Sequence, residues 1–396
     1  MIDLEQLTEK YLDKIIEHRR YIHSHPEVSL KEAGTAKYIA EALKDMGLTP
    51  NTNIGGNGVV AIIEGRRPGK CIGLRADFDA LPMQEVTGLP YASQNDGVCH
   101  SCGHDSHAAM LLGCAYILNE LRNEFDGTVK LVFQPAEESP LEGGAPDMIA
   151  DGVLENPHVD AMIGQHVWPS LATGTVGLRN GAMFGASDRF FLTVKGRSAA
   201  GSSPEDGIDA IVIAANVINA LQTIVSRNVS PMDSSVVTIG TISGGDRYNI
   251  LANSVYMEGT CRSVTQETRD SMADRIEKVV KGVTEALGGE YEFQYCRGYS
   301  PTINDPAMFQ MVYDTMREQL GENARILDKA ELGGEDFSYF CEKVPSVYYF
   351  LGCRPAEIPY AEFPPLHHGG FNMDERCIPI GTEMMVRTAL RFLGAL

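Results

Sequence analysis

The sequence has little positive charge. Its 33 Lys and Arg residues stand against 53 Asp and Glu residues, which gives a formal net charge of −20. A surface this acidic repels phosphate backbones and anionic lipid headgroups, because like charges oppose association. We therefore expect neither a nucleic-acid partner nor a membrane partner.

The sequence also lacks obvious targeting and cross-linking features. Its first residues, Met1 to Glu5, contain neither a basic start nor an apolar run. We identify no stretch that approaches the roughly 18 uncharged apolar residues of a spanning helix. The nine cysteines are odd in number and lack regular spacing, which fits reduced thiols better than a disulfide framework. These absences predict a soluble, unexported, cytoplasmic protein.

The length and the order of patterns indicate two domains. At 396 residues the chain exceeds the roughly 250 to 300 residues at which single cores stop growing. The first part alternates short apolar runs with helical patterns, as in a largely parallel sheet covered by helices on both faces. A strand, helix, strand, strand, helix, strand order then follows, which is typical of a ferredoxin-like unit. We expect an α/β fold whose catalytic domain, 1–180 and 297–396, is interrupted by an inserted α+β domain, 181–296.

Cysteine and histidine cluster in one segment, CHSCGHDSH at 99–107, although only ten histidines serve the whole chain. Thiolate, imidazole and carboxylate together suit zinc, manganese, cobalt or nickel. Gly103 lets the backbone bend so that Cys102 and His104 converge. A redox or structural pair of Cys99 and Cys102 is the competing interpretation at this point.

Three further segments place ligand-type side chains where strands end or loops turn. VFQPAEE delivers Glu137 and Glu138 after a strand, IGQHVWP ends a strand in His166, and LHHGGFNMDE places His367 and His368 on a glycine-rich loop. Neighbouring residues on an extended backbone point in opposite directions, so one glutamate can bind metal while the other faces substrate. Solvated acids, a core histidine and surface histidines are the ordinary alternatives. Jointly, these are the residue types that a two-metal hydrolase requires.

These segments resemble a metallopeptidase-type amidohydrolase family that contains aminoacylases, hippurate hydrolases, carboxypeptidases and plant hydrolases of indoleacetate and jasmonate conjugates. The resemblance runs nearly end to end. It rests on RRYIHSHPEVSLKE at 19–32, GLRADFDALPMQE at 73–85, CGHDSH at 102–107, FQPAEE at 133–138, QHVWP at 165–169, GGEDFSYF at 333–340 and HHGGFNMDE at 367–375. It implies a dinuclear-metal aminopeptidase-like catalytic domain with an inserted lid and dimerisation domain, and hence a homodimer.

The resemblance also implies a centre of two divalent metal ions, which would be manganese, zinc, cobalt or nickel. The implied ligands are Cys102, His104, Glu138, His166 and His367. His367 is preferred to His368 because the family's ligand commonly follows a leucine, here Leu366. Asp79 matches the family acid that orients a ligand. Asp77 lies where exopeptidase relatives carry a histidine ligand, and this difference favours the acylase branch.

The same resemblance makes Glu137 the catalytic base. A water held between two divalent ions has its pKa lowered from about 15.7 towards neutrality, and Glu137 takes its proton as it attacks the amide carbonyl. The glutamate then returns that proton to the leaving amine. The implied activity is a metal-dependent amidohydrolase that cleaves N-acyl amino acids or related small amide conjugates.

The inserted domain departs from the family pattern at one position. In the family, a loop of the type Lys-Gly-x-x-x-His-Gly supplies a histidine for the oxyanion, whereas the matching loop at 194–209 has Ala200 in that place. A methyl group cannot donate a hydrogen bond. The protein therefore uses another donor, or is impaired, or was deliberately altered.

Two residues of the inserted domain match substrate-contacting positions of relatives. These are Asn249 in RYNILANS and Arg262 in GTCRS. Arginine binds a carboxylate through charge-assisted, often bidentate hydrogen bonds, which would select acylated amino acids with a free carboxyl group. A solvated charge at a strand end is the alternative for Arg262.

Three functions are compatible with the sequence. The first is a metal-dependent acylase acting on a small N-acyl amino acid. The second is a dipeptidase or carboxypeptidase of the same fold, which hydrolysis of dipeptides would reveal. The third is a metal-binding pseudoenzyme, which would stay inactive even after Ala200→His restores the histidine.

Overall fold

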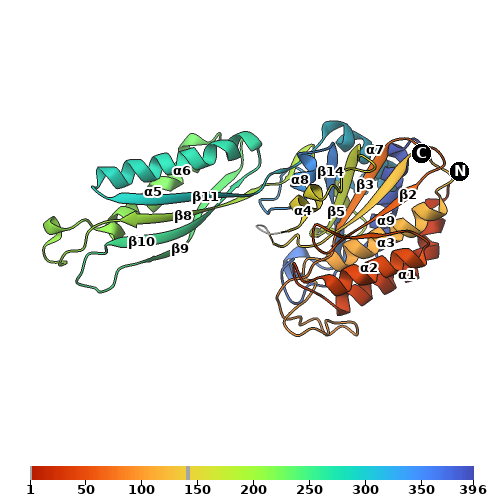
Figure 1. Ribbon diagram of the computed structural model, residues 1–396, viewed down its shortest axis with the longest axis horizontal. Coiled ribbons are helices and arrows are strands. Elements are labelled where there is room, and N and C mark those ends of the chain that lie inside the picture. The colour runs from red at the N-terminus through yellow and green to blue at the C-terminus, as the bar shows by residue number, and fades with distance from the viewer. Residues whose placement is uncertain (1, 140–142) are drawn as a thin grey trace. The chain divides into compact units, whose positions relative to one another are not determined.

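The computed structural model describes residues 2–139 and 143–396, and the chain forms two compact units (Figure 1). Unit 1 comprises Met1–Met183, Ile303–Lys329 and Asp336–Leu396, and unit 2 comprises Phe184–Thr302 and Ala330–Glu335. Both ends of the chain therefore belong to unit 1. Strands β7 (Gly181–Phe184) and β12 (Thr302–Asn304) pair with each other where the chain passes between the units.

Within the described residues, unit 1 is built on a mixed sheet with the strand order β1-β2-β4-β3-β5-β14-β6-β13. Its strands are β1 Asn51–Ile54, β2 Gly58–Glu64, β3 Cys71–Asp77, β4 Thr128–Gln134, β5 Ala161–Ala172, β6 Val176–Leu178, β13 Ala324–Ile326 and β14 Ser346–Arg354. The central strands β4, β3, β5 and β14 are parallel to their neighbours in this group. Every residue of β3 is buried, as expected for a parallel strand covered on both faces.

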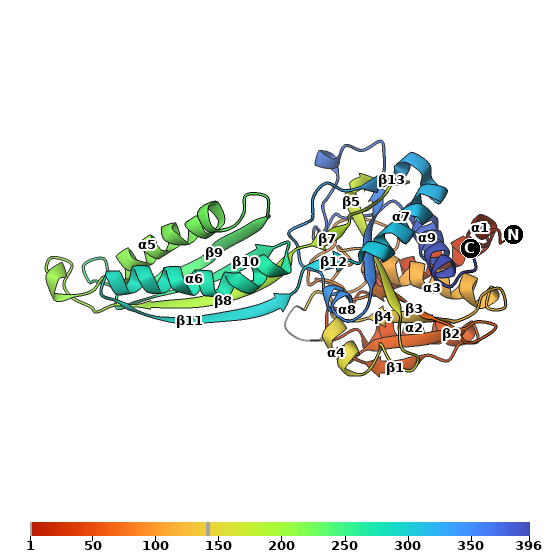
Figure 2. The same cartoon turned by 90° about the horizontal axis from the view of Figure 1, so that it is seen from above.

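Helices cover both faces of this sheet, with α3 and α9 on one side and α4 and α8 on the other (Figure 2). The helices of unit 1 are α1 Leu4–Ser24, α2 Ala33–Asp45, α3 His104–Glu120, α4 Ala145–Ala150, α7 Pro306–Leu320, α8 Ser338–Cys341 and α9 Cys377–Phe392. Helix α3 packs against α1 and α9 as well as the sheet. Its sequence is apolar on nearly every side and it is almost wholly buried, which is typical of a core helix.

The parallel strands bring the loops of the expected site to one edge. In the register of β3 and β4, the last residues of the two strands, Asp77 and Gln134, lie opposite each other. Strand β5 pairs with β3 on its other side and carries His166. Because functional loops gather at the carboxyl ends of parallel strands, the segments after β3 and β4 begin side by side.

Unit 2 is an antiparallel sheet with the strand order β11-β8-β10-β9. Its elements are β8 Ala186–Lys195, α5 Ala210–Thr223, β9 Ser235–Gly244, β10 Ser254–Ser263, α6 Gln266–Ala286 and β11 Glu290–Tyr299. This is the order that we expected for a ferredoxin-like unit. Helices α5 and α6 lie along one face of the sheet and share its hydrophobic core (Figure 1).

One helical segment is more apolar than we expected from the sequence. Ala210–Asn228, which is α5 with the π-helical turn after it, is long and apolar enough to cross a membrane by length and composition. Our expectation that no such stretch exists was wrong. The buried residues of α5 recur at helical spacing and pack into the core of unit 2, which is the pattern of an amphipathic helix on a sheet.

Candidate metal centre

The five expected ligands come together in unit 1. Cys102 precedes α3, His104 begins it, Glu138 follows β4, His166 lies in β5, and His367 lies between β14 and α9. Ligand atoms of Cys102, His104 and His166 lie within 4.8 Å of one another, and so do those of Cys102, Glu138 and His367. Cys102 belongs to both groups, so its sulfur is placed to serve two ions.

The ligand-type atoms of this cluster lie close to one another, and two of them lack a hydrogen-bond partner among the described residues. The sulfur of Cys102 lies 3.4 Å from Nε2 of His166 and 3.3 Å from Nε2 of His367. Oε1 of Glu138 lies 3.0 Å from Nε2 of His367, yet it has no hydrogen-bond partner among the described residues, and neither has Nε2 of the buried His104. Buried polar atoms are normally satisfied. The donor types and these unpartnered atoms therefore fit divalent cations.

The two buried histidines are held so that Nε2 faces the cluster. Nδ1 of His104 lies 3.0 Å from the carboxylate of Asp79, and Nδ1 of His166 lies 2.7 Å from the carbonyl oxygen of Val167. Each Nδ1 donates a proton to an oxygen, so the neutral form of each ring has its lone pair on Nε2. Metal-ligating histidines are oriented in this way by carboxylates and carbonyls. Asp79 also accepts the backbone N–H of Glu138 at 3.0 Å.

Unusual backbone conformations place three of the site segments. Gly103 has φ +88, and a Cβ atom there would lie 2.4 Å from the side chain of Val167, so only glycine fits. Ala136 and His367 have φ values of 54 and 60. Residues other than glycine seldom adopt this region and persist there when their surroundings hold them. The N–H of Ala136, for example, donates to Glu32 at 2.9 Å.

The two adjacent glutamates do not point apart, as an extended backbone would require. Strand β4 ends at Gln134, and Glu137 and Glu138 lie in a turn. As a result, carboxylate oxygens of both residues lie within 4.8 Å of a ring nitrogen of His104. Glu137 is buried. The turn lets one glutamate join the ligand group while the other stays beside it.

Burial and charge act differently on each ligand. Burial alone would lower the pKa of His104, but Asp77 and Asp79 raise it to about 10. Burial, reinforced by Glu138, raises the pKa of the Cys102 thiol well above its usual range. Burial lowers the pKa of His166 far below its usual range, so this imidazole is neutral and ready to bind. Cations would reverse the first two shifts because they favour thiolate and neutral imidazole.

Other residues of the sequence motifs stay outside this cluster. All nine cysteines are free thiols, so Cys99 and Cys102 form no disulfide. Nδ1 of His368 accepts the backbone N–H of Gly370 at 3.0 Å.

Sequence reasoning missed His107, whose Nδ1 lies 2.6 Å from Asp77. Its position one helical turn after His104 was the available signal.

The remaining candidates, Ala200, Asn249 and Arg262, belong to unit 2. Ala200 is exposed and forms an antiparallel bridge with Ile250. The next residue, Gly201, donates its N–H to the carbonyl of Asn249 at 2.8 Å, so Ala200 and Asn249 lie on adjoining loops. Arg262 donates to the hydroxyl of Thr260 at 2.7 Å and has no ion pair within the described part of the chain. Its guanidinium is therefore available to an anionic ligand.

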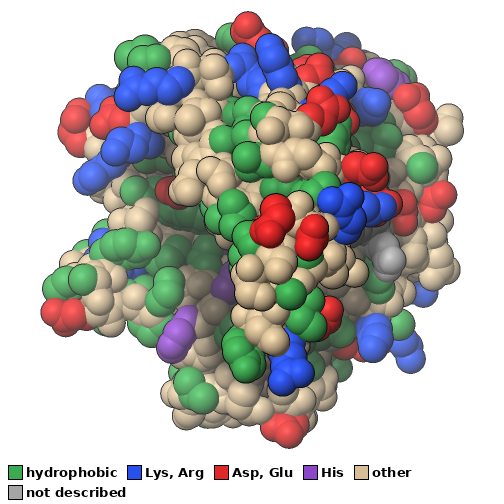
Figure 3. All heavy atoms as spheres, turned by 90° about the vertical axis from the view of Figure 1, so that its left-hand side faces the viewer, with side chains coloured by type: hydrophobic (Ala, Val, Ile, Leu, Met, Phe, Trp, Pro, Cys, Tyr) green, Lys and Arg blue, Asp and Glu red, His purple; other side chains and the backbone are tan. Residues whose placement is uncertain are grey.

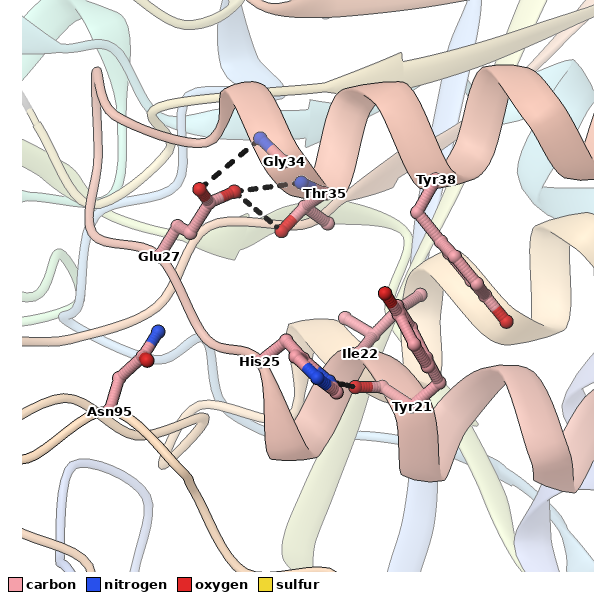
Figure 4. Close-up of a pocket in the computed structure, with 8 residues that line it drawn as sticks. All are labelled: Tyr21, Ile22, His25, Glu27, Gly34, Thr35, Tyr38 and Asn95. Carbon is pink, nitrogen blue, oxygen red and sulfur yellow. Dashed lines mark hydrogen bonds between the residues drawn. The ribbon is translucent and has the colours of Figure 1, made fainter.

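A separate pocket of about 200 Å³ lies between α1 and α2 in unit 1, and its lining includes none of the expected site residues (Figure 4). There the carboxylate of Glu27 accepts the backbone N–H groups of Gly34 and Thr35, at 3.2 and 2.7 Å. Two residues later, the hydroxyl of Ser29 donates to Asp79 at 2.7 Å. The motif around Glu27 thus caps α2 and supports the carboxylate that orients His104.

Comparison with known proteins places this site in context. The sequence pattern of Peptidase family M20/M25/M40 matches residues 73–391. An N-acetyl-L-cysteine deacetylase of Bacillus subtilis is 38% identical over 378 residues, 95% of this chain and 88% of that protein. An N-acyl-L-amino acid amidohydrolase of Geobacillus stearothermophilus is 40% identical over 302 residues, 76% of this chain and 81% of the relative.

Solved structures show the same likeness. The crystal structure of the Bacillus subtilis YXEP protein, described as a dinuclear metal binding peptidase, aligns with a TM-score of 0.84 and 31% identity. The alignment covers 98% of this chain and 100% of that one. The similarity therefore includes both units and the segments that carry the candidate ligands.

Proposed function

Because the chain belongs to peptidase family M20/M25/M40, a family of hydrolases that includes dinuclear metal-binding members, we propose that it hydrolyses the amide bond of N-acyl amino acids. The single observation that carries this proposal is the convergence of thiol, imidazole and carboxylate groups around the unpartnered Nε2 of His104. Cys102, His104, Glu138, His166 and His367 would hold two divalent ions. Relatives named as a deacetylase and an acyl amino acid amidohydrolase support the substrate class.

The chain's own residues supply the remaining chemistry. Divalent ions, when bound, polarise an amide carbonyl and lower the pKa of an attacking water. Glu137 is buried beside the ligand group, where its carboxylate would accept the proton of that water. It would then donate the proton to the leaving amine nitrogen, as a general base that becomes a general acid. Asp79 would not take part in the proton transfer. It accepts the hydrogen bond from Nδ1 of His104 and so fixes the orientation of that ring.

Unit 2 would recognise the amino-acid half of the substrate. Arg262 is half-buried and lacks an ion pair in the described residues, so a substrate carboxylate would be its natural partner. Asn249 lies beside Ala200 and offers an amide group for the substrate's amide. Ala200 offers no donor to the oxyanion, so turnover by this protein would be slow while substrate binding would remain intact.

A substrate comparison tests the function. The parent protein and Ala200→His are loaded with manganese, cobalt, nickel or zinc, and release of free amine is measured with N-acetyl and N-benzoyl amino acids and with dipeptides. We expect release from the acylated amino acids, faster in Ala200→His. Preferential cleavage of dipeptides would assign a peptidase instead. No release by either protein with any metal would leave a metal-binding protein without this activity.

A further inference from the structure

A network of buried, hydrogen-bonded polar side chains lies next to the candidate metal centre. Arg75 donates to Oδ1 of Asp336 at 2.7 Å and to Oδ2 of Asp77 at 2.5 Å. Oδ1 of Asp77 in turn lies 2.6 Å from Nδ1 of His107. All four residues are at most 1% exposed. Charged groups buried this deeply are retained only where they are paired and hydrogen-bonded.

The proton of His107 can be placed from its two neighbours. The backbone N–H of Val167 donates to Nε2 of His107 at 2.9 Å, so Nε2 carries the lone pair. The proton therefore lies on Nδ1 and is donated to Asp77. Ligand-type atoms of Asp77, His104 and His107 lie close enough to hold an ion, but in this arrangement both ring nitrogens of His107 are already used.

This network of hydrogen-bonded side chains joins the three segments that carry candidate ligands. His107 lies one turn after His104 in α3, and Val167 follows His166 in β5. Gln134, which ends β4 ahead of the two glutamates, accepts from Arg75 at 2.9 Å and donates to Asp336 at 2.6 Å. A shift of any one segment would break a buried hydrogen bond of this network. The ligand-bearing segments are thus held at one mutual spacing.

Residue 77 must accept two hydrogen bonds at once. Arg75 and His107 both donate to it, each to a different oxygen, and a carboxylate can accept both. An asparagine offers one acceptor and one donor, so either orientation sets a donor against a donor. With the amide nitrogen toward His107, the clash is relieved only if the proton of His107 moves to Nε2, where it would face the N–H of Val167. With the amide nitrogen toward Arg75, the buried guanidinium loses its acceptor at this position. A neutral amide at position 77 therefore disturbs the strand that carries His166.

We propose that Asp77 and His107 are positioning residues of the metal centre, held from beneath by Arg75 and Asp336. In this role Asp77 selects the tautomer of His107, and His107 fixes the part of β5 beside His166. The inference rests on the proposed metal centre but not on which amide is hydrolysed. Both carboxylate oxygens of Asp77, the last residue of β3, are thereby occupied by Arg75 and His107.

The tautomer tests the arrangement directly. In metal-free protein labelled with ¹⁵N-histidine, long-range ¹H–¹⁵N spectra should show His107 protonated on Nδ1, with its signals identified by their loss in His107→Gln. In Asp77→Asn the proton should move to Nε2 or the ring should lose a single tautomer. A parent protein with His107 protonated on Nε2 would overturn the proposal.

Metal affinity tests the positioning role without any substrate. Zn²⁺ is titrated into full-length protein against a competing chelator dye. Asp77→Asn should weaken binding about 10-fold to 100-fold, as loss of an orienting partner typically does. His107→Gln, which keeps one donor and one acceptor, should bind more tightly than His107→Leu.

Asp188→Asn is the matched control. Asp188 is an equally buried carboxylate that pairs with Arg269 at 2.9 Å in unit 2. Its substitution should destabilise the fold but leave Zn²⁺ affinity within about 2-fold, since Asp188 belongs to unit 2 and shares no hydrogen-bond partner with the candidate ligands. If Asp77→Asn binds Zn²⁺ as the parent does, the positioning role is wrong even if the enzyme is an amidohydrolase. If the parent binds no Zn²⁺, the proposed metal centre itself fails.

Discussion

Oδ1 of Asp79 lies 3.0 Å from Nδ1 of His104, and this contact turns Nε2 of His104 toward the other candidate ligands. The same carboxylate accepts from Ser29 and from the backbone of Glu138. Asp79 therefore links the helix that begins at His104 to the turn that carries the two glutamates. Together with Asp77 it also makes His104 unusually basic in the protein without metal.

Metal affinity should rise with pH. With its pKa raised to about 10, His104 is protonated at neutral pH in the metal-free protein, and the raised pKa of Cys102 keeps that side chain a thiol. Metal binding must displace both protons, so Zn²⁺ affinity should increase by up to about 100-fold per pH unit. Proton release and affinity measured by calorimetry between pH 6 and 8 check this. Affinity that is flat across this range would contradict it.

The raised pKa of His104 has the opposite effect on the folding of the metal-free protein, whose free energy of unfolding should fall as the pH rises. The pKa of His104 is raised in the folded state, so its stabilising contribution is fully present below the unfolded value of about 6.5. That contribution is lost as pH rises through about 10. Metal-free protein should therefore lose stability over this window, while Zn²⁺ binding strengthens.

Glu137→Gln should keep both ions and lose turnover. Glutamine has the same shape as glutamate but cannot accept the water's proton, so kcat should fall by roughly 3 to 5 powers of ten. The measurement is kcat and metal content in the Ala200→His background. Glu205→Gln, on the surface of unit 2, is a control that should change neither value. Near-parental kcat in Glu137→Gln would place the base elsewhere.

Ala200→His should raise kcat with little change in KM. A histidine that donates to the oxyanion stabilises only the transition state, and such donors contribute roughly 100-fold to 1000-fold in kcat. Steady-state kinetics on an N-acyl amino acid separate the two constants. If kcat is unmoved while metal occupancy is full, the role assigned to position 200 is wrong.

Unit 2 should mediate a homodimer. Strand β9 is an edge strand with Ile242 56% exposed, and α5 exposes Ile211 and Val212 at 48% and 51%. Patches of hydrophobic side chains are visible on the face drawn in Figure 3. Unpaired strand edges and apolar patches are typical sites of association.

Sedimentation at micromolar concentration tests this interface. The parent should sediment as a dimer and Ile211→Asp with Ile242→Lys as a monomer. Leu287→Asp is the control, because Leu287 is 46% exposed at the end of α6, away from β9. A parent that is monomeric at this concentration would refute the dimer.

Long periodic segments made much of the fold predictable. One of the helical patterns expected in the first part of the chain is α3, and the element order of unit 2 follows from alternating strand and helix patterns. Strands β6 and β13 were not predicted because each has only three residues, which is too short to show a period. The apolar run of α5 was overlooked because its asparagines interrupt the pattern without adding charge.

The candidate ligands could be named from the sequence because their residue types cluster in short motifs that resemble those of a known family. What the sequence could not show were relationships across strands and turns. The left-handed Ala136 turns both glutamates toward His104, and no propensity of alanine predicts that conformation. Likewise, the pairing of Asp77 with His107 depends on the packing of α3 against the sheet. Such contacts require the tertiary structure.

The most direct test of the account is a metal titration followed by activity. Chelator-treated parent and Ala200→His proteins receive stepwise Zn²⁺ or Mn²⁺, and bound metal and release of amino acid from an N-acetyl amino acid are measured together. We expect no hydrolysis without metal and activity that saturates at about two ions per chain. Hydrolysis that persists after complete metal removal, or two bound ions without hydrolysis in either protein, would contradict it.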